Sequence, residues 1–341
     1  MAIEPIELVI LGATGAVGRT LLQVLEEREF PVKRLRLLAG EASAGTELEF
    51  QGEPIVAQKV SEAGFQGAQV AIFAAGVEAA RTWAPRAVAQ GCAVVDLSGA
   101  FGLEADVALV VPEVNPGALV RWRERRIVAS PSSGAVQLAL ALKPIEDAAG
   151  IEHVIVATYE SVSSAGHQAV EQLEREAQAL MNGVEPPEPK RIPHRIAFNI
   201  VPGIGAIGPD GVSEAEERLV AETRKLLGRP DLAIAATSVR VPVFYGQGQA
   251  VHLRTRKALG AEQARELLRR APGVKLIDSP AENVYPMPML AVNDDSALVG
   301  RVREDRSREN GLALFVVADE LRKGAAVNAV QIAELLLLGP M

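Results

Sequence analysis

Residues 7–18, ELVILGATGAVG, place a short apolar strand directly before a glycine-rich turn. The turn has the spacing Gly12-x-x-Gly15-x-x-Gly18, and a helical pattern follows over residues 19–28. Gly12 permits the tight turn, Gly15 lets the backbone approach a pyrophosphate, and Gly18 lets helix and strand pack closely. In this context the turn favours a dinucleotide site. The alternative is an ordinary strand-to-helix turn that uses glycine for geometry alone.

The end of the second expected strand, residues 34–39, bears on which dinucleotide such a site would take. A protein that binds the 2'-phosphate of NADP is expected to supply Arg or Lys there, and residues 39–45 contain neither. Glu41 could instead accept a hydrogen bond from a ribose hydroxyl, which would favour NAD over NADP. Glu41 as a solvated loop residue is the alternative.

Strands and helices alternate through the first part of the chain, which is typical of a doubly wound parallel sheet. The expected strands are 7–11, 34–39, 70–74 and 93–97, and a helix is expected over 77–90. We therefore expect an α/β protein with a Rossmann-like, doubly wound N-terminal domain.

The pattern changes near Ile151, where a second, α+β domain is expected. Its expected strands are 153–159, 239–244 and 250–255, and its expected helices are 168–181, 214–227 and 261–270. The apolar last helix, 328–338, is expected to pack back onto the first domain. The predicted boundaries are 1–130 plus 325–341 for the first domain and 131–324 for the second.

Composition excludes several classes of partner. The 341 residues carry a formal net charge of -8 without a Lys/Arg run, which argues against nucleic acid. We expect no signal peptide, no membrane span and no metal site, because none of the corresponding patterns is present. The single cysteine, Cys92, is expected to be a core residue, and it fits a reducing cytoplasm.

Ser133 lies where chemistry would be expected. Residues 127–129 form a short apolar run, and a helical stretch follows at 136–142, so Ser133 falls at a strand-to-helix turn. A thiol at a helix N-terminus would readily form a thiolate. A serine there stays a protonated alcohol unless an adjacent base activates it.

The order of motifs resembles that of aspartate-β-semialdehyde dehydrogenases over nearly the whole chain. The segments that carry the resemblance are 12–18, 30–32, 35–39, 110–115, 197–199, 222–225, 240–243, 299–301 and 321–336.

The resemblance implies a Rossmann domain and a dimerising α+β domain with the C-terminal fold of glyceraldehyde-3-phosphate dehydrogenase. It implies a cytoplasmic homodimer that uses NADP and a cysteine thioester to reduce aspartyl phosphate. It also implies that the cofactor-binding positions are Gly12, Thr14, Gly15, Ala16, Val17, Gly18, Ser43 and Gln331.

The departures from the family pattern gather at its catalytic site. The family's Asn-Pro-x-Cys motif reads Ser130-Pro131-Ser132-Ser133 here. The family's acid–base histidine, seven residues after the substrate-binding Arg240, is Gln247, and its acyl-orienting glutamine is Glu160. Its phosphate-binding arginine is Gly102, and its Glu-Glu-x-Lys aligns with residues 215–218, Ala-Glu-Glu-Arg.

Some catalytic alternatives remain open at this point. A Ser133–Glu160 pair is the best surviving catalytic arrangement, and the alternative is that the two side chains only hydrogen-bond each other. Arg240 either binds a substrate carboxylate or forms a structural ion pair. His167 either lines the pocket or has a surface or capping role.

Three functions follow from these residues. The first is a catalytically degenerate, Usg-type paralogue of the dehydrogenase that keeps the fold and an NAD or NADP site with weak or lost recognition of the 2'-phosphate. The second is an active enzyme of altered chemistry that uses Ser133. The third is a non-enzymatic partner that forms a heterodimer with an active semialdehyde dehydrogenase.

Overall fold

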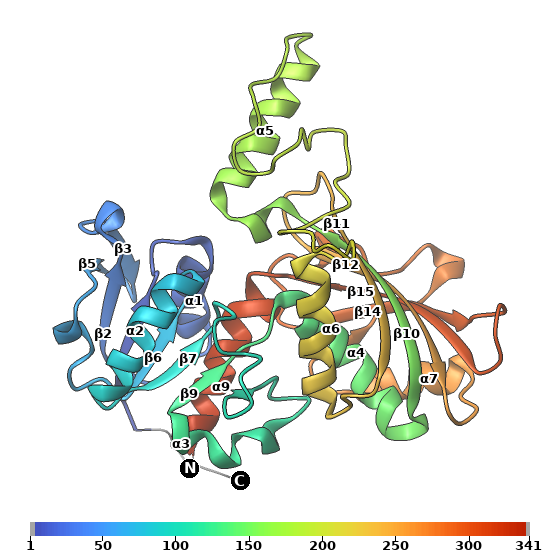
Figure 1. Cartoon of the computed structure of the whole chain (residues 1–341), viewed down its shortest axis with the longest axis horizontal. Helices are drawn as coiled ribbons and strands as arrows, with labels where there is room; N and C mark the ends of the chain where they lie inside the picture. Colours follow the sequence, from blue (N-terminus) through green and yellow to red (C-terminus); the bar gives the residue numbers. More distant parts are fainter. Residues whose placement is uncertain (1–3, 339–341) are drawn as a thin grey trace. The chain divides into compact units, whose positions relative to one another are not determined.

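The computed structural model describes residues 4–338, which divide into two compact units (Figure 1). The first unit holds the chain up to Ser132 and resumes at Gly324, and the second is Ser133–Lys323. None of the helices within residues 4–338 is long and apolar enough to cross a lipid bilayer.

The first unit is built on a seven-stranded parallel sheet. Its strand order is β5-β2-β1-β6-β7-β9-β8. The strands are β1 (Ile6–Leu11), β2 (Val32–Ala39), β5 (Gln58–Lys59), β6 (Val70–Phe73), β7 (Ala93–Asp96), β8 (Ala108–Leu109) and β9 (Ile127–Ala129). The chain leaves β1 first towards β2 and later towards β6, which is the doubly wound topology that the alternating pattern predicts.

Helices from both ends of the sequence complete this unit. They are α1 (Ala16–Glu27), α2 (Val77–Ala89), α3 (Trp122–Arg125) and α9 (Val327–Leu338), and a small hairpin joins β3 (Glu47–Phe50) to β4 (Glu53–Val56). Helix α9, red in Figure 1, packs against α1 and β7 although it is last in the sequence. Its Val330 and Ile332 are buried in the same core as Leu8 and Ile10 of β1. The expected return of the last helix is confirmed.

The second unit has a six-stranded mixed sheet of order β11-β10-β12-β15-β14-β13. The strands are β10 (Ile151–Glu160), β11 (Ala233–Arg240), β12 (Gln247–Thr255), β13 (Val274–Leu276), β14 (Ala297–Glu304) and β15 (Gly311–Ala318). The strand expected at 239–244 is wrong, because β11 ends at Arg240. Pro242 has no N–H to donate to a ladder, so the segment beyond Arg240 is better suited to a connection.

Helices cover one face of the mixed sheet. They are α4 (Ser133–Ala149), α6 (Glu214–Leu227) and α7 (Ala261–Arg270). Helix α5 (His167–Met181) packs against the 3-10 turn Val162–Ala165, and α8 (Pro288–Ala291) contacts β15. Helix α4 contacts β10, β12, β14 and β15, and α6 and α7 pack beside it. On the opposite face Ile155 and Tyr159 of β10 are 38% and 37% exposed. Helix α5 stands out from the sheet in Figure 1 and has a small apolar core of its own.

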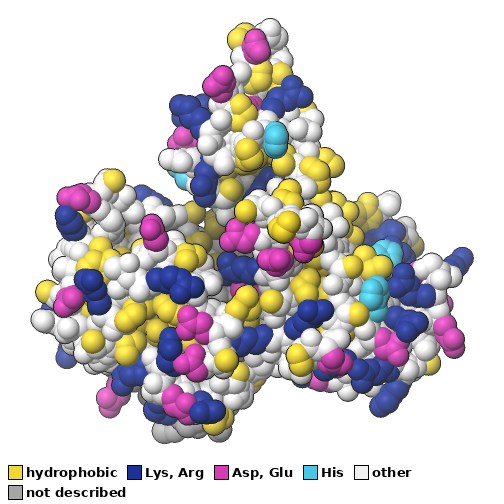
Figure 2. Space-filling model, in the orientation of Figure 1, with side chains coloured by type: hydrophobic (Ala, Val, Ile, Leu, Met, Phe, Trp, Pro, Cys, Tyr) yellow, Lys and Arg dark blue, Asp and Glu magenta, His cyan; other side chains and the backbone are white. Residues whose placement is uncertain are grey.

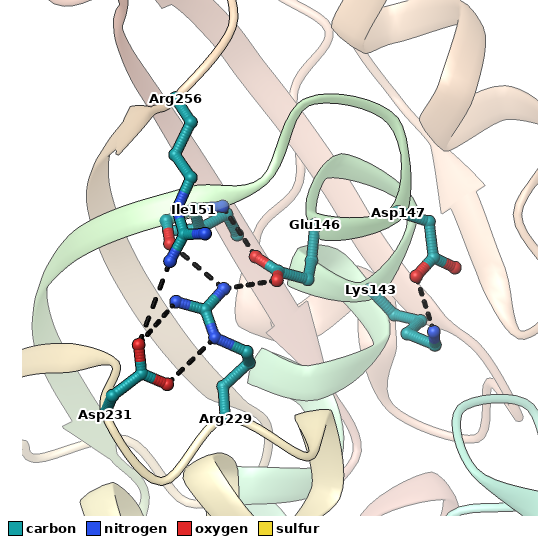
Figure 3. A network of polar contacts seen from close by, with 7 residues as sticks. All are labelled: Lys143, Glu146, Asp147, Ile151, Arg229, Asp231 and Arg256. Atoms are coloured by element: carbon teal, nitrogen blue, oxygen red, sulfur yellow. Dashed lines mark hydrogen bonds and ion pairs between the residues drawn. The ribbon is translucent and has the colours of Figure 1, made fainter.

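A polar network joins α4, the segment after α6 and the start of β10 in the second unit (Figure 3). Arg229, just after α6, binds Glu146 of α4 and donates to the Ile151 carbonyl where β10 begins. Its other nitrogens lie 3.0 and 3.1 Å from the Asp231 carboxylate. These bonds raise the pKa of Arg229, so it stays charged and joins the helix ends to the sheet.

Both signs of charge are spread over the face of the molecule in Figure 2. Lys and Arg side chains alternate there with Asp and Glu, and no continuous basic area is seen on this face. Some charged side chains of the protein form ion pairs within one helix, such as Lys143–Asp147 at 2.6 Å.

Candidate functional site

The glycine turn of the first unit has the geometry that its spacing predicts. Gly12 has a φ of +88°, and a Cβ there would lie 2.6 Å from the Ala74 carbonyl oxygen. A Cβ on Gly18 would lie 2.3 Å from the Gly12 carbonyl oxygen. Both positions therefore require glycine, the first for conformation and space and the second for close packing of α1 against the turn.

The start of α1 can receive an anion. Gly15, the residue before the helix, is exposed and has no side chain that could cap the N–H groups of the first turn. The first turn of α1 carries no acidic residue. Backbone N–H groups at such a helix start are donors for a phosphate, and the helix dipole adds to the attraction.

The other predicted cofactor positions also lie in the first unit. Thr14, Ala16 and Val17 are half-buried in the turn and in the first turn of α1. Ser43 ends the short 3-10 helix Glu41–Ser43, which follows β2. Gln331 of α9 donates from Nε2 to Glu113 Oε1 at 2.9 Å.

In the second unit three predicted site residues meet at one edge of the mixed sheet. Strands β10 and β11 are parallel, and their last residues, Glu160 and Arg240, lie opposite each other. Strand β12 is antiparallel to β10 and begins at Gln247, beside that edge. Strand pairing therefore brings together residues that are 80 or more positions apart, as the register Glu160↔Arg240 shows.

Ser133 and Gln247 are directly hydrogen-bonded. The Ser133 hydroxyl, at the first residue of α4, donates to Gln247 Oε1 at 2.9 Å. Gln249, two residues further along β12 and on the same face, donates from Nε2 to the Gly134 carbonyl at 2.9 Å. A Cβ on Gly134 would come within 3.2 Å of Gln247 Nε2, so the glycine allows this close approach.

The Ser133–Glu160 pair expected from the sequence is wrong. Ser133 donates to Gln247, whereas Glu160 accepts from Thr158 Oγ1 at 3.3 Å and lies 3.6 Å from Arg240 Nη1. Burial raises the pKa of Glu160, and the Arg240 charge and the Thr158 hydrogen bond act in the opposite direction. The carboxylate is held beside Arg240 because their strands end in register.

Arg240 is engaged within the protein. Besides Glu160, it contacts the Ser161 carbonyl at 2.7 Å and the Ser164 hydroxyl, and it is only 7% exposed. Burial lowers its pKa, and the neighbouring carboxylates of Glu160 and Glu320 raise it. Arg240 thus forms an ion pair within the protein, and its binding of a substrate carboxylate stays a prediction.

The remaining expected polar residues also have structural partners. Glu216 accepts the backbone N–H groups of Ser213 and Ser238, both at 2.8 Å, and forms a capping box at the start of α6. Arg218 lies 2.8 Å from the buried Glu222 on the same helix. His167 is exposed at the start of α5, where it lies 3.3 Å from Glu171, so it has the surface role.

Two residues of this region were missed in the sequence. Gln249 was overlooked because the strand was expected to begin at residue 250, whereas β12 begins at Gln247. Glu320 follows β15 and is 3% exposed; it accepts the Ser163 hydroxyl and the Gly246 N–H. The alternation Gln247-x-Gln249, two amides on one strand face, was the only available signal.

Cys92 is no replacement nucleophile. It is fully buried, its Sγ contacts the Phe65 carbonyl at 3.4 Å, and burial raises its pKa to about 11. The expected core role of Cys92 is confirmed. Among residues 4–338, no three His, Cys, Asp or Glu side chains gather as ligands of a metal ion would.

Comparisons with known proteins agree with the two units. Residues 7–122 match the NAD-binding domain of semialdehyde dehydrogenases, and residues 142–323 match their dimerisation domain. An aspartate-semialdehyde dehydrogenase of Aquifex aeolicus is 46% identical over 329 residues, which cover 96% of this chain and 97% of that protein.

Solved structures agree as well. The crystal structure of aspartate semialdehyde dehydrogenase II from Vibrio cholerae has a TM-score of 0.96 at 43% identity, covering 99% of this chain and 100% of that one. A probable aspartate-semialdehyde dehydrogenase from Pseudomonas aeruginosa has a TM-score of 0.92 at 35% identity, covering 98% and 99%. The chain therefore belongs to the aspartate-semialdehyde dehydrogenase family, with its NAD(P)-binding domain and its dimerisation domain.

Proposed function

We propose that this chain is a catalytically degenerate, Usg-type paralogue of aspartate-semialdehyde dehydrogenase, which keeps the fold but not the thioester chemistry. The observation that carries the proposal is the hydrogen bond from the Ser133 hydroxyl to Gln247 Oε1 at 2.9 Å. The resemblance aligns these two residues with the family's catalytic cysteine and histidine. A neutral alcohol and a neutral amide occupy the places of a thiol and a base.

Neither replacement can perform the step that the family requires. A serine alcohol needs a base to become a nucleophile, and an amide does not accept a proton near neutral pH. The nearby carboxylate, Glu160, has Thr158 and Arg240 as its partners instead of Ser133. An oxygen ester formed on Ser133 would also be a poorer hydride acceptor than a thioester.

We also expect weak binding of aspartyl phosphate, because a charged ligand of the phosphate is missing. Gly102 stands at the aligned position of the family's phosphate-binding arginine and offers no side-chain charge. Arg240 is retained, but its contacts are with Glu160, Ser161 and Ser164. An anionic substrate would have to compete with these internal partners.

The nucleotide site is the part of the machinery that is kept. The backbone N–H groups at the start of α1 would bind the pyrophosphate of NAD or NADP, and Gly12 and Gly18 keep the turn compact. When bound, the nicotinamide supplies or accepts a hydride.

A homodimer is proposed through the open face of the mixed sheet. Ile155 and Tyr159 are more than one-third exposed on that face, and the Tyr159 ring packs 6.1 Å from the Phe315 ring. Residues 142–323, which contain this sheet, match a dimerisation domain. Apolar and aromatic side chains on an uncovered sheet face favour packing against a second copy.

The direct test is reduction of NAD or NADP by the purified protein with the semialdehyde and phosphate. We expect no turnover above the protein-free rate in wild type or in the control S133A. Introducing a thiol and an imidazole together, in S133C/Q247H, is expected to give a measurable burst of reduced nucleotide, because it restores nucleophile and base.

Turnover by the wild type that S133A abolishes would contradict degeneracy and support the enzyme of altered chemistry. Turnover equal in wild type and S133A would also contradict it and would exclude Ser133 as the nucleophile. Co-expression with an active homologue, followed by affinity capture, tests the heterodimer alternative. Recovery of a mixed dimer would support that alternative.

A further inference from the structure

An ion pair lies at the edge of the parallel sheet where its strands end. Lys59 Nζ is 2.7 Å from Glu41 Oε1. Lys59 is the last residue of β5 and lies opposite Ala39, the last residue of β2. Glu41 follows β2 by two residues, so parallel pairing brings together side chains that are 18 positions apart.

The pair lies on the same sheet edge as the glycine turn. The Gly12 N–H donates to the Leu38 carbonyl at 2.8 Å, which ties the turn to the end of β2. In open α/β sheets, ligands bind beyond the carboxyl ends of the strands, and an acidic residue after the second strand contacts the adenosine ribose. Glu41 has this position, and Lys59 lies beside it at the end of the neighbouring strand β5.

The backbone that carries the pair is held firmly, but the side chains are open to a ligand. The Val60 N–H donates to the Ala39 carbonyl at 3.0 Å, and Gly45 N–H donates to Ala57 at 2.8 Å. The side chains of Glu41 and Lys59 are 82% and 61% exposed. An ion pair as exposed as this contributes little to stability, so folding gives no strong reason for it.

We propose that Glu41, oriented by Lys59, accepts hydrogen bonds from the adenosine ribose hydroxyls and makes the site selective for NAD over NADP. The inference rests on the proposed retention of the nucleotide site. A 2'-phosphate would replace a hydroxyl donor with a second anion beside the Glu41 carboxylate. Residues 39–45 supply no Arg or Lys to compensate, and Lys59 is engaged with Glu41.

The test is calorimetric titration of the full-length protein with NAD and with NADP, which does not depend on turnover. We expect wild type to bind NAD at least about tenfold more tightly than NADP. E41Q removes the charge and frees Lys59, so it is expected to weaken NAD binding and strengthen NADP binding by a similar factor. K59M is expected to weaken both.

Matched controls lie elsewhere in the same unit. E53Q removes an exposed carboxylate from β4, and K33M removes an exposed cation from the opposite end of β2. Both are expected to keep the wild-type ratio of the two dissociation constants. A change in E41Q that these controls do not share is therefore local to the pair.

The inference would be overturned if wild type bound NADP more tightly than NAD, if K59M lost that preference and if E41Q did not increase it. Lys59 would then be a phosphate ligand. An unchanged ratio of dissociation constants in E41Q would overturn it as well. Failure of wild type to bind either nucleotide would overturn the retained site itself, which is a different result from binding with the wrong preference.

Discussion

At the residue scale, the proposed loss of chemistry lies in a few side chains. Ser133 and Gln247 satisfy each other with one hydrogen bond, and Gln249 is bonded to the Gly134 carbonyl beside them. The identities of Ser133 and Gln247 and their relation to the family motif could be read from the sequence. Their direct bond could not, because 114 residues separate them and only the packing of α4 on β12 brings them together.

Glu320 supports a prediction on pH-dependent stability. Burial raises the pKa of this carboxyl, which accepts hydrogen bonds from the Ser163 hydroxyl and the Gly246 N–H. A raised pKa in the folded state means that Glu320 favours folding at pH values below the ordinary glutamate pKa of about 4.3, and this contribution is lost as the pH rises. E320Q is therefore expected to be more stable than wild type at pH 8.

Urea denaturation at several pH values measures this difference. The advantage of E320Q should shrink as the pH falls and vanish below the ordinary glutamate pKa, because wild type is then protonated in both states. E188Q, in an exposed loop, is the control and should follow wild type at every pH. An advantage of E320Q that grew on acidification would contradict the assignment.

At the element scale, the segment that stands out from the second unit is held by polar side chains of α5. Glu176 is fully buried and accepts the N–H groups of Ile196 and Ala197 at 2.8 and 2.9 Å. Gln172, one turn earlier, accepts the N–H groups of Arg191 and Ile192. These bonds join residues 19 to 21 positions apart, so they could not be predicted from local sequence.

E176A is expected to loosen this loop. Removing the carboxylate leaves two buried N–H groups without their acceptor, at a cost of about 1–3 kcal/mol each. Hydrogen exchange of the Ile196 and Ala197 amides should be faster by one or more orders of magnitude. The control E174A lies on the exposed side of the same helix and should leave exchange unchanged. Equal protection in E176A and wild type would show that the apolar cluster alone holds the loop.

At the scale of the whole molecule, the open face of the mixed sheet predicts the oligomeric state. Ile155 is 38% exposed and lies opposite His252 on this face. A homodimer that packs two such faces together would bury Ile155, and I155D would place a carboxylate in that interface without a partner. Light scattering after gel filtration should give a dimeric mass for wild type and a monomeric mass for I155D.

The control for this prediction is V77D, at an apolar residue that is 46% exposed on α2 of the first unit. It should remain dimeric. A monomeric wild type would exclude the homodimer, whereas a dimeric I155D would move the interface to another surface.

The sequence alone determined the fold class, because a glycine turn between strand and helix and the alternation of strands with helices depend on local spacing. The predicted two-domain α/β organisation with a dimerisation domain is confirmed by the family matches and solved structures. The replacements at positions 133, 160 and 247 were equally visible. Only the tertiary structure decided which of these side chains meet, because strand register and helix packing join residues that are distant in the chain. It paired Ser133 with Gln247 instead of Glu160, and it placed Lys59 beside Glu41.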